Sequence, residues 1–417
     1  MGLAEQRRRQ HAGRGRRLTA AMSNTVLVLN SGSSSIKFGL FDISAVEPTL
    51  LCKGPLDEHD AKPRLVVKSP AGEDLFEKRR EASDADSDHL FADVLGFIED
   101  RFGDHRLRAV GHRVVHGGPD YSAPVELTDD VTAKLEALTP LAPLHQPRCL
   151  APVRAIKAIR PDLTHIACFD TAFHHGIAPP ANRFAIPRRY EERGVRRYGF
   201  HGLSFEYVAE RLARIAPQLV AKRTVIAHLG NGASLCGLRD GRSMDTTMGL
   251  TPLDGLVMGT RCGRIDPGVL LYLQQHEKMS VEDVQHLLYH ESGLLGVSCI
   301  ASDMRTLLAS SEAAAREAVE LFTFRAAQEV AAMATTLAGL DCLVFTGGIG
   351  EHASEIRSAI GERLEWLGVR IDAAANDAAR ERINGGDSAV DVFVIPTNEE
   401  LMIAQHCAAV LRPDNRI

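Results

Sequence analysis

A short segment near the N-terminus, residues 25–42, constrains the fold of this chain more than any other feature. Two apolar stretches flank a turn that contains Asn30, Gly32 and four serines. After the turn, apolar side chains alternate with Lys37 and a glycine, which is the period of a half-buried strand. Glycine lets backbone N–H groups approach an anion, while hydroxyls and lysine add donors and charge. The segment therefore predicts a β-hairpin whose turn binds phosphate, with a serine-rich surface turn as the alternative.

The length and composition of the chain are those of an ordinary globular protein. A chain of 417 residues exceeds what one hydrophobic core usually supports, so we expect two domains. It is 45% hydrophobic and 24% charged, and no apolar run is long enough to span a membrane, so no membrane partner is expected. Eight cysteines include no CxxC pair, which favours reduced thiols in the cytoplasm over disulfides or a zinc site.

The first residues differ in charge from the rest of the chain. Residues 1–21 hold six arginines and one glutamate, a net charge of +5, so the remaining residues carry −11 of the total of −6. A basic tail can bind nucleic acid or anionic lipid, but we expect residues 1–23 to be a disordered basic extension. The acidic balance of the body argues against nucleic acid as a ligand.

Strand-like and helix-like segments alternate along the chain, which predicts the α/β class. Residues 57–88 are polar and mixed in charge, and we expect them to leave the sheet. The expected strands cover residues 107–115, 164–169, 224–228, 233–238, 341–345 and 390–395. The expected helices cover residues 87–102, 312–338 and 355–367, with a last helix that begins at 398.

Two further turns have the chemistry of anion-binding loops. One is the His-Leu-Gly-Asn-Gly turn of residues 228–232, and the other is the Gly-Gly-Ile-Gly-Glu turn of residues 347–351. The second contains a G-x-G-x-x-A pattern, with Asp372 near the ribose-binding offset of a dinucleotide fold, so an NAD-dependent dehydrogenase is an alternative. No GxxxxGK[ST] sequence exists, which excludes a P-loop nucleotide site.

Arginine and histidine residues are concentrated in three short glycine-rich segments, residues 111–118, 197–202 and 258–267. Cations held on tight turns suit the charge that develops on a phosphoryl group during its transfer. The alternative for Arg113 and Arg261 is a structural ion pair with a buried carboxylate. These segments, together with the three phosphate-type turns, favour a phosphotransferase.

Taken in order, these motifs closely resemble the acetokinase (acetate kinase) family over residues 24–411. They include Asn-Ser-Gly-Ser-Ser-Ser-Ile-Lys, Gly-His-Arg-Val-Val-His-Gly-Gly, Phe-Asp-Thr-Ala-Phe-His, Tyr-Gly-Phe-His-Gly, His-Leu-Gly-Asn-Gly, Gly-Thr-Arg, Gly-Gly-Ile-Gly-Glu and Pro-Thr-Asn-Glu-Glu. The resemblance implies two ribonuclease-H-like domains of the actin-like ATPase and sugar kinase superfamily, with ATP in the cleft between them. We expect residues 24–172 plus 397–417 to form the N-terminal domain and residues 173–396 the C-terminal domain.

The same resemblance implies reversible phosphoryl transfer from ATP to acetate, which requires Mg²⁺, with Mn²⁺ possible, in a cytoplasmic homodimer. A propionate kinase on the same scaffold and a non-catalytic ATP-binding module are the alternatives. The implied catalytic residues are Asp170, His201 and Arg261. The implied acetate-binding residues are Arg113, Val115, Leu144, Phe200 and Pro252, and the implied metal-site residues are Asn30 and Glu399. The implied nucleotide-binding residues are Lys37, His228, Leu229, Gly230, Asn231, Gly232, Asp303, Met304, Arg305, Gly347, Gly348, Ile349, Gly350 and Glu351.

Three positions need comment. Asp170 matches the acid/base residue of the family, but a simple carboxylic acid is already ionised at pH 7, so we expect Asp170 to align Arg113 and Mg²⁺ instead. Phe205 stands where the family usually has histidine, four residues after His201, and we expect its ring to stack over the turn that carries His201. Arg264 stands where the family usually has aspartate, and we expect it to add positive charge near a phosphate-binding loop.

Overall fold

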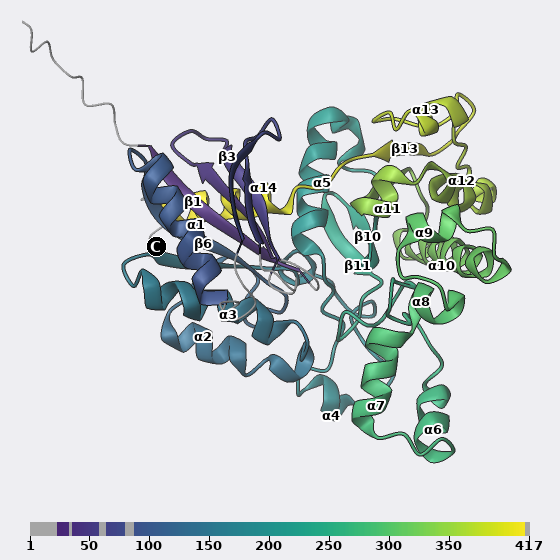
Figure 1. Ribbon diagram of the computed structural model, residues 1–417. Coiled ribbons are helices and arrows are strands. Elements are labelled where there is room, and N and C mark those ends of the chain that lie inside the picture. The colour runs from purple at the N-terminus through teal and green to yellow at the C-terminus, as the bar shows by residue number, and fades with distance from the viewer. Residues whose placement is uncertain (1–22, 33–35, 58–63, 80–86, 413–417) are drawn as a thin grey trace, which may run out of the picture.

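The computed structural model describes residues 23–32, 36–57, 64–79 and 87–412. The expected basic extension, apart from its last residue, and the three serines of the first turn lie outside the described residues. The described chain forms two α/β halves that lie side by side, with the N-terminal half in purple to blue and most of the C-terminal half in teal to yellow (Figure 1). Each half is built on its own sheet.

The first sheet has eight strands in the order β5-β4-β3-β2-β1-β6-β8-β7. Strands β1 and β2 form an antiparallel hairpin in which Asn30 lies opposite Lys37, which confirms the predicted hairpin. Strand β6 pairs parallel to β1, and β8 pairs parallel to β6. The strands are β1 (Asn24–Ser31), β2 (Ile36–Asp42), β3 (Thr49–Asp57), β4 (Arg64–Lys68), β5 (Asp74–Arg79), β6 (Arg106–Val114), β7 (Val125–Glu126) and β8 (Thr164–Phe169).

The expectation that residues 57–88 leave the sheet is wrong. Strands β4 and β5 extend the sheet beyond β3 by antiparallel pairing. Leu65 and Val67 of β4 are buried in the core beneath helix α1 (Ser87–Phe102). Strand β5 is the edge strand and its residues are half-buried or exposed, so its polar composition does not distinguish it from a surface loop.

The second sheet has five strands in the order β11-β10-β9-β12-β13. It repeats the plan of the first sheet. Strands β9, β10 and β11 pair antiparallel, and β12 and β13 then add to β9 in parallel, as β6 and β8 add to β1. This repetition confirms the predicted α/β fold with two similarly built halves. The strands are β9 (Thr224–Leu229), β10 (Ala233–Arg239), β11 (Arg242–Thr246), β12 (Cys342–Thr346) and β13 (Asp391–Val394).

Helices cover both faces of each sheet. On β1, Leu27 and Leu29 face α1 and α3 (Gln146–Ile159), whereas Val26 and Val28 face the last helix, α14 (Glu399–Leu411). This division follows from the alternation of side chains along a strand. On the second sheet, α5 (Gly202–Ile215) covers one face and the long α10 (Ala313–Leu337) the other.

The remaining helices are shorter and connect these layers. They are α2 (Asp129–Glu136), α4 (Arg188–Glu191), α6 (Pro267–Gln275), α7 (Val281–His286), α8 (Gly293–Ser298), α9 (Met304–Ala309), α11 (Gly347–His352), α12 (Ser354–Arg363) and α13 (Ala373–Asp377). A π-helical turn, Leu287–Glu291, follows α7. None of the helices in the described part of the chain has both the length and the apolar character needed to cross a membrane.

Helix α14 returns the end of the chain to the first sheet, where it packs on β1 after the chain leaves β13 of the second sheet (Figure 1). The residues that lead into α14 therefore pass from one half of the molecule to the other. The boundaries expected for the two domains stay a prediction.

Candidate active site

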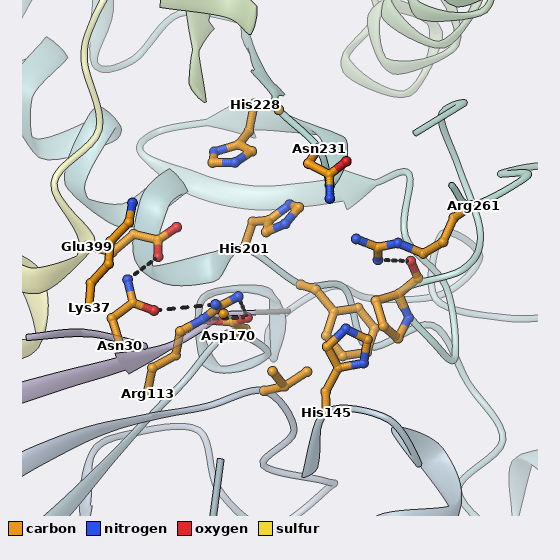
Figure 2. A pocket seen from close by; sticks show the side chains of 16 residues that line it. Asn30, Lys37, Arg113, His145, Asp170, His201, His228, Asn231, Arg261 and Glu399 are labelled. Atoms are coloured by element: carbon orange, nitrogen blue, oxygen red, sulfur yellow. Dashed lines mark hydrogen bonds and ion pairs between the residues drawn. The ribbon is translucent and has the colours of Figure 1, made fainter. Parts of the chain in front are cut away.

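A cavity of about 220 Å³ lies between the two halves of the molecule (Figure 2). It is found where β1, β6, β8 and β9 end, because Asn30, Arg113, Asp170 and His228 all lie at or just beyond the carboxyl ends of these strands. In open α/β sheets this is the usual place for a ligand. The sequence patterns located these residues on separate strands, and the fold brings them to one cavity.

Arg113 and Asp170 form an ion pair in this cavity. Nε of Arg113 donates to both oxygens of Asp170 at 2.9 and 3.1 Å, and Nη2 donates to Oδ2 at 2.6 Å. Burial alone would lower the pKa of the Arg113 guanidinium, but the charge of Asp170 outweighs it and leaves that pKa raised. Among the described residues, the Nη1 group makes two long contacts, with Asn30 Oδ1 at 3.4 Å and with Ser31 O at 3.3 Å. A substrate carboxylate could replace these two contacts without breaking the ion pair.

Asn30 joins the end of β1 to the start of α14. Its Nδ2 group donates to Glu399 Oε2 and to Glu400 Oε1, both at 2.9 Å. Burial by itself would raise the pKa of the Glu399 carboxyl. Nearby groups outweigh burial and lower this pKa, and the positive charge of Arg113 contributes most to the lowering. Lys37 lies beside Glu399 at the rim of the cavity (Figure 2). One amide and one carboxylate therefore line this wall, with the Glu400 carboxylate bonded behind them.

His201 occupies a strained backbone position at the start of α5. Its φ of 61° and ψ of 22° lie in the left-handed region, which residues other than glycine rarely adopt. In this conformation the backbone N–H of His201 hydrogen-bonds the carboxylate of Asp170, and the next N–H, of Gly202, donates to the carbonyl of Asp170 at 2.8 Å. The strain thus places the imidazole of His201 in the cavity directly above the ion pair (Figure 2).

The imidazoles of His201 and His228 stack with ring centroids 4.4 Å apart. Each ring uses its Nδ1 atom to bond a serine hydroxyl at 2.8 Å, Ser234 for His201 and Ser204 for His228. Burial lowers the pKa of both imidazoles, and their neighbouring positive charges lower that of His201 further. Both rings are therefore held neutral, with their Nε2 atoms left to face a ligand.

Arg261 faces the same cavity from the second half. Its side chain is buried, Nη1 donates to the carbonyl of Pro252 at 2.7 Å, and no carboxylate of the described residues lies within ion-pair distance. Burial lowers the pKa of its guanidinium to about 10. A Cβ atom on Gly232 would lie 2.8 Å from Arg261 Nη2, so the loop after β9 approaches this cation closely. Arg261 is thus a buried positive charge that no carboxylate of the described chain neutralises.

Apolar side chains close one end of the cavity. Val115, Phe200 and Pro252 line it, as expected, together with His145. Leu144 does not line it, because the chain turns into α3 at this point and presents His145 to the cavity while Leu144 is 37% exposed. Leu144 therefore lies outside this cavity, and its expected contact with the acetate methyl group stays a prediction. Burial lowers the pKa of His145 to about 3, so this ring is neutral as well.

A second cavity of about 650 Å³ adjoins the first, and Gly230 and Asn231 line both. Five residues expected on the nucleotide side line this second cavity: Asp303, Met304, Arg305, Gly348 and Ile349. The pair of cavities therefore forms one site with a polar, charged end and a larger end.

Four other residues expected to bind nucleotide line neither cavity. Leu229 is buried within β9, and Gly350 is buried within α11. Gly347 is buried with a φ of +77°, where a Cβ atom would lie 2.8 Å from the carbonyl of Leu229. The carboxylate of Glu351 accepts from backbone N–H groups instead. These residues shape the loops that line the site.

Comparison with known proteins decides the family. A profile of the Acetokinase family matches residues 25–405. The chain belongs to the acetokinase family. The acetate kinase of Rhodopseudomonas palustris (strain TIE-1) is 51% identical over 391 residues, covering 92% of this chain and 98% of that protein. The acetate kinase of Methylocella silvestris is 48% identical over 398 residues, covering 94% and 98%.

Solved structures of acetokinase relatives have the same fold. A propionate kinase from Francisella tularensis superposes with a TM-score of 0.85 at 39% identity, covering 92% of this chain and 98% of that one. The Porphyromonas gingivalis acetate kinase superposes with a TM-score of 0.82 at 35% identity, covering 94% and 100%. The predicted family and fold are thus confirmed. Asp372, expected near a ribose in the dehydrogenase alternative, instead caps α13 by accepting from Ala375 N at 2.7 Å.

Two residues in this acetokinase differ in placement from what their motifs suggested. Phe205 is fully buried, and its ring contacts are with His174 and His228, at centroid distances of 5.4 and 6.3 Å. Arg264 lines neither site cavity, because its exposed side chain points to Glu329 of α10 with a separation of 3.4 Å. The expectation that it adds charge near a phosphate loop is wrong.

Sequence reasoning missed two residues that support the site without lining either cavity. Glu400 bonds Asn30, and the doubled glutamate of the Pro-Thr-Asn-Glu-Glu motif was a signal that could have indicated it. Tyr289 lies in the π-helical turn, and its carbonyl accepts from Thr260 at 2.8 Å next to Arg261. Its side chain hydrogen-bonds Thr251, beside the Pro252 that Arg261 contacts. No motif marks this tyrosine, so only the fold reveals it.

Proposed function

We propose that this protein is an acetate kinase, which transfers the γ-phosphoryl group of ATP to acetate and yields acetyl phosphate and ADP. The observation that carries the proposal is Arg261, a buried cation with no carboxylate partner in the described part of the chain, which faces neutral imidazoles and glycine-rich loops. An anion that enters the cavity gains a strong interaction with this charge, because water is displaced and no counter-ion competes.

The reaction needs no general base. Acetate has a pKa near that of glutamate, so at pH 7 its oxygen is already anionic and can attack the γ-phosphorus directly. The bond from that phosphorus to the β–γ bridging oxygen breaks, and ADP leaves with the electron pair. Asp170, which is engaged by Arg113 and by the His201 backbone, would align these groups and hold no proton in transit.

Different side chains of the cavity would bind acetate and stabilise the transferring phosphoryl group. Arg113 would hold the acetate carboxylate through Nη1, whose contacts are long, while Val115, Phe200 and Pro252 surround the methyl group. Arg261 and the Nε2 atom of His201 would stabilise the charge on the transferring phosphoryl oxygens. The adenosine moiety would occupy the larger cavity.

The donor set at the end of β1 fits a magnesium ion. Asn30, Glu399 and Glu400 offer amide and carboxylate oxygens, the ligands that Mg²⁺ prefers. Within the described residues, no group of three or more His, Cys, Asp or Glu side chains could hold a metal ion. Asn30 and Glu399 would therefore hold the ion jointly with the phosphates of ATP, and the ion would neutralise charge on those phosphates when bound.

Acyl phosphate trapping tests the proposal. Purified protein is incubated with ATP, MgCl₂ and acetate, propionate or butyrate, and hydroxylamine converts any acyl phosphate to a coloured hydroxamate. We expect product only when nucleotide, metal and carboxylate are all present, with acetate preferred. One extra methylene in an apolar pocket changes transition-state binding by about 1–3 kcal/mol, so propionate should react more slowly. Absence of product from all three acids would contradict the proposal.

We also propose that the enzyme is a cytoplasmic homodimer. All eight cysteines are free thiols, which is typical of a reducing compartment. Helix α6 has no buried residue, and Leu271 and Tyr272 on it are each more than half exposed, so this helix offers apolar surface for a second copy. Light scattering coupled to gel filtration should show a dimer, and Leu271→Asp should shift it toward monomer.

A further inference from the structure

One carboxylate links the nucleotide side of the site to the segment that carries Glu399. Glu351 Oε1 accepts a hydrogen bond from the N–H of Gly347, the first residue of its own helix α11, at 2.9 Å. The same oxygen accepts from the N–H of Thr397 at 3.1 Å. We infer that Glu351 is a positioning residue, which sets the place of Glu399 relative to the loop that lines the nucleotide cavity.

The bond to Thr397 lies at a critical point of the chain. Ile395 still belongs to the second half, because its N–H donates to the carbonyl of Phe345 in β12 at 3.0 Å. Asn398 already caps α14, because its Oδ1 accepts from the N–H of Leu401 at 3.0 Å. Between Ile395 and this cap lie only two residues, 396 and 397, and residue 396 is a proline without an N–H group. The Thr397 bond therefore fixes this crossing two residues before Glu399.

The other end of the link is also fixed. Arg357 is fully buried and donates through Nη1 to the carbonyls of Gly350 and Glu351, at 2.9 and 3.0 Å. Its Nε and Nη2 groups bond the side chain and the backbone carbonyl of Asn376, both at 2.7 Å. The backbone of Glu351 is thus held from behind, and its side chain can act as a rigid arm toward Thr397.

This arrangement couples two walls of the site through one atom. Gly348 and Ile349, which lie within α11, line the nucleotide cavity, and Glu399 lines the smaller cavity. Loss of the Glu351 carboxylate would leave the Thr397 N–H without this acceptor and would free the start of α14. A misplacement of a reacting group by about 1 Å can cost about 100-fold in rate. The inference rests on the proposed function, in which Glu399 helps to hold the metal and ATP.

The test compares Glu351→Ala, Glu351→Gln and Thr397→Pro, with Glu362→Ala on the exposed side of α12 as the control. Glu351→Ala should lower kcat about 30- to 100-fold and raise the Mg²⁺ concentration for half-maximal rate. Glu351→Gln should stay within about threefold, because an amide oxygen can accept both N–H groups. Thr397→Pro removes the N–H itself and should lower kcat as much as Glu351→Ala does. The double variant Glu351→Ala with Thr397→Pro should show the same kcat as either single variant, because both changes break the same bond.

Two measurements separate this role from its competitors. Hydrogen exchange of residues 397–402 should accelerate at least about tenfold in Glu351→Ala and not in Glu362→Ala. Calorimetric titration with ADP should show nearly unchanged affinity. A raised KM for ATP with weaker ADP binding at unchanged kcat would mean that Glu351 only supports the nucleotide loop, and unchanged exchange would also overturn the inference. Absence of acyl phosphate from the wild type would overturn the proposed function instead, and the exchange measurement would still decide the role of Glu351.

Discussion

Arg113 and Arg261 line the same cavity from opposite halves of the molecule, yet their surroundings differ sharply. Arg113 meets Asp170 through two nitrogens at distances down to 2.6 Å, and the pKa of its guanidinium is raised. Arg261 bonds a backbone carbonyl, has no carboxylate partner among the described residues, and burial lowers its pKa to about 10. One charge is neutralised before any substrate arrives, and the other is not.

The difference teaches how the site divides stability from catalysis. An ion pair that is buried and hydrogen-bonded holds its geometry, and removal of one partner leaves a costly buried charge. A buried cation without a counter-ion destabilises the folded protein, but it interacts strongly with an anion that enters the cavity. We therefore expect Arg113 to matter for both folding and activity, and Arg261 to matter for activity alone.

The largest expected effect is on stability. Arg113→Ala should lower the free energy of unfolding by about 3–5 kcal/mol, because Asp170 stays buried without its partner. Denaturation by urea measures this change. The double variant Arg113→Ala with Asp170→Ala should recover more than half of the loss, since no charge is then stranded. A loss below about 1 kcal/mol in the single variant would show that the ion pair does not hold this wall.

The next effect is on catalysis and sharpens the comparison directly. Arg261→Ala should lower kcat/KM at least about 100-fold, or about 2.7 kcal/mol, the scale of one lost transition-state donor. Its melting temperature should stay equal to that of the wild type or rise, because the uncompensated charge is gone. Arg264→Ala, three residues along the chain and exposed, is the matched control and should change kcat/KM little. A destabilised but active Arg261→Ala would reverse the assignment.

The pH dependence tests whether buried histidines in and behind the site are neutral in the folded protein. Burial lowers the pKa values of His116 and His174 to about 4 and that of His145 to about 3. The unfolded chain binds protons near pH 6.5 and the folded chain does not, so stability should be constant above pH 6.5 and fall below it. Each buried histidine should contribute a loss of about 1.4 kcal/mol per pH unit, until the pH reaches its folded pKa.

Urea denaturation at pH 7.5, 6.5 and 5.5 gives this slope. In His174→Gln the amide can replace the bonds of His174 to Ser243 and to the carbonyl of Phe200. This variant should lose stability less steeply with falling pH than the wild type, by the contribution of one histidine. If stability rose as the pH fell from 6.5 to 5.5, the imidazoles would gain protons on folding, and the neutral site described here would be wrong.

The smallest expected effects concern the residues that differ from the usual family pattern. Phe205→His and Arg264→Asp should each change kcat/KM by less than about tenfold, or about 1.4 kcal/mol. Phe205 packs on the back of His228, so its change should be the larger, while Arg264 lies on the surface with Glu329. Acyl phosphate trapping measures both variants. Our proposal of a working kinase would be contradicted if the wild type were nearly inactive and the double variant Phe205→His with Arg264→Asp restored its activity.

Much of the fold and the site could be predicted from local patterns. The alternating residues around Lys37 predicted the first hairpin, and Asn398 predicted the start of α14, because turn chemistry and side-chain period act over a few residues. Strand β5 could not be predicted, since an exposed edge strand has no buried face to leave a pattern. The outward orientation of Leu144 was equally hidden, because it depends on how α3 packs.

The sequence by itself determined the family, the α/β class and the residue types of the site, because these depend on motifs and periods that are local. It could not determine which arginine is neutralised, although ion pairing was a stated alternative for both Arg113 and Arg261. Only the tertiary structure decided it, by setting the end of β6 beside the end of β8, where Asp170 lies, and by leaving Arg261 opposite a glycine loop. Charge pairing depends on distances between segments far apart in the chain, and folding alone sets those distances.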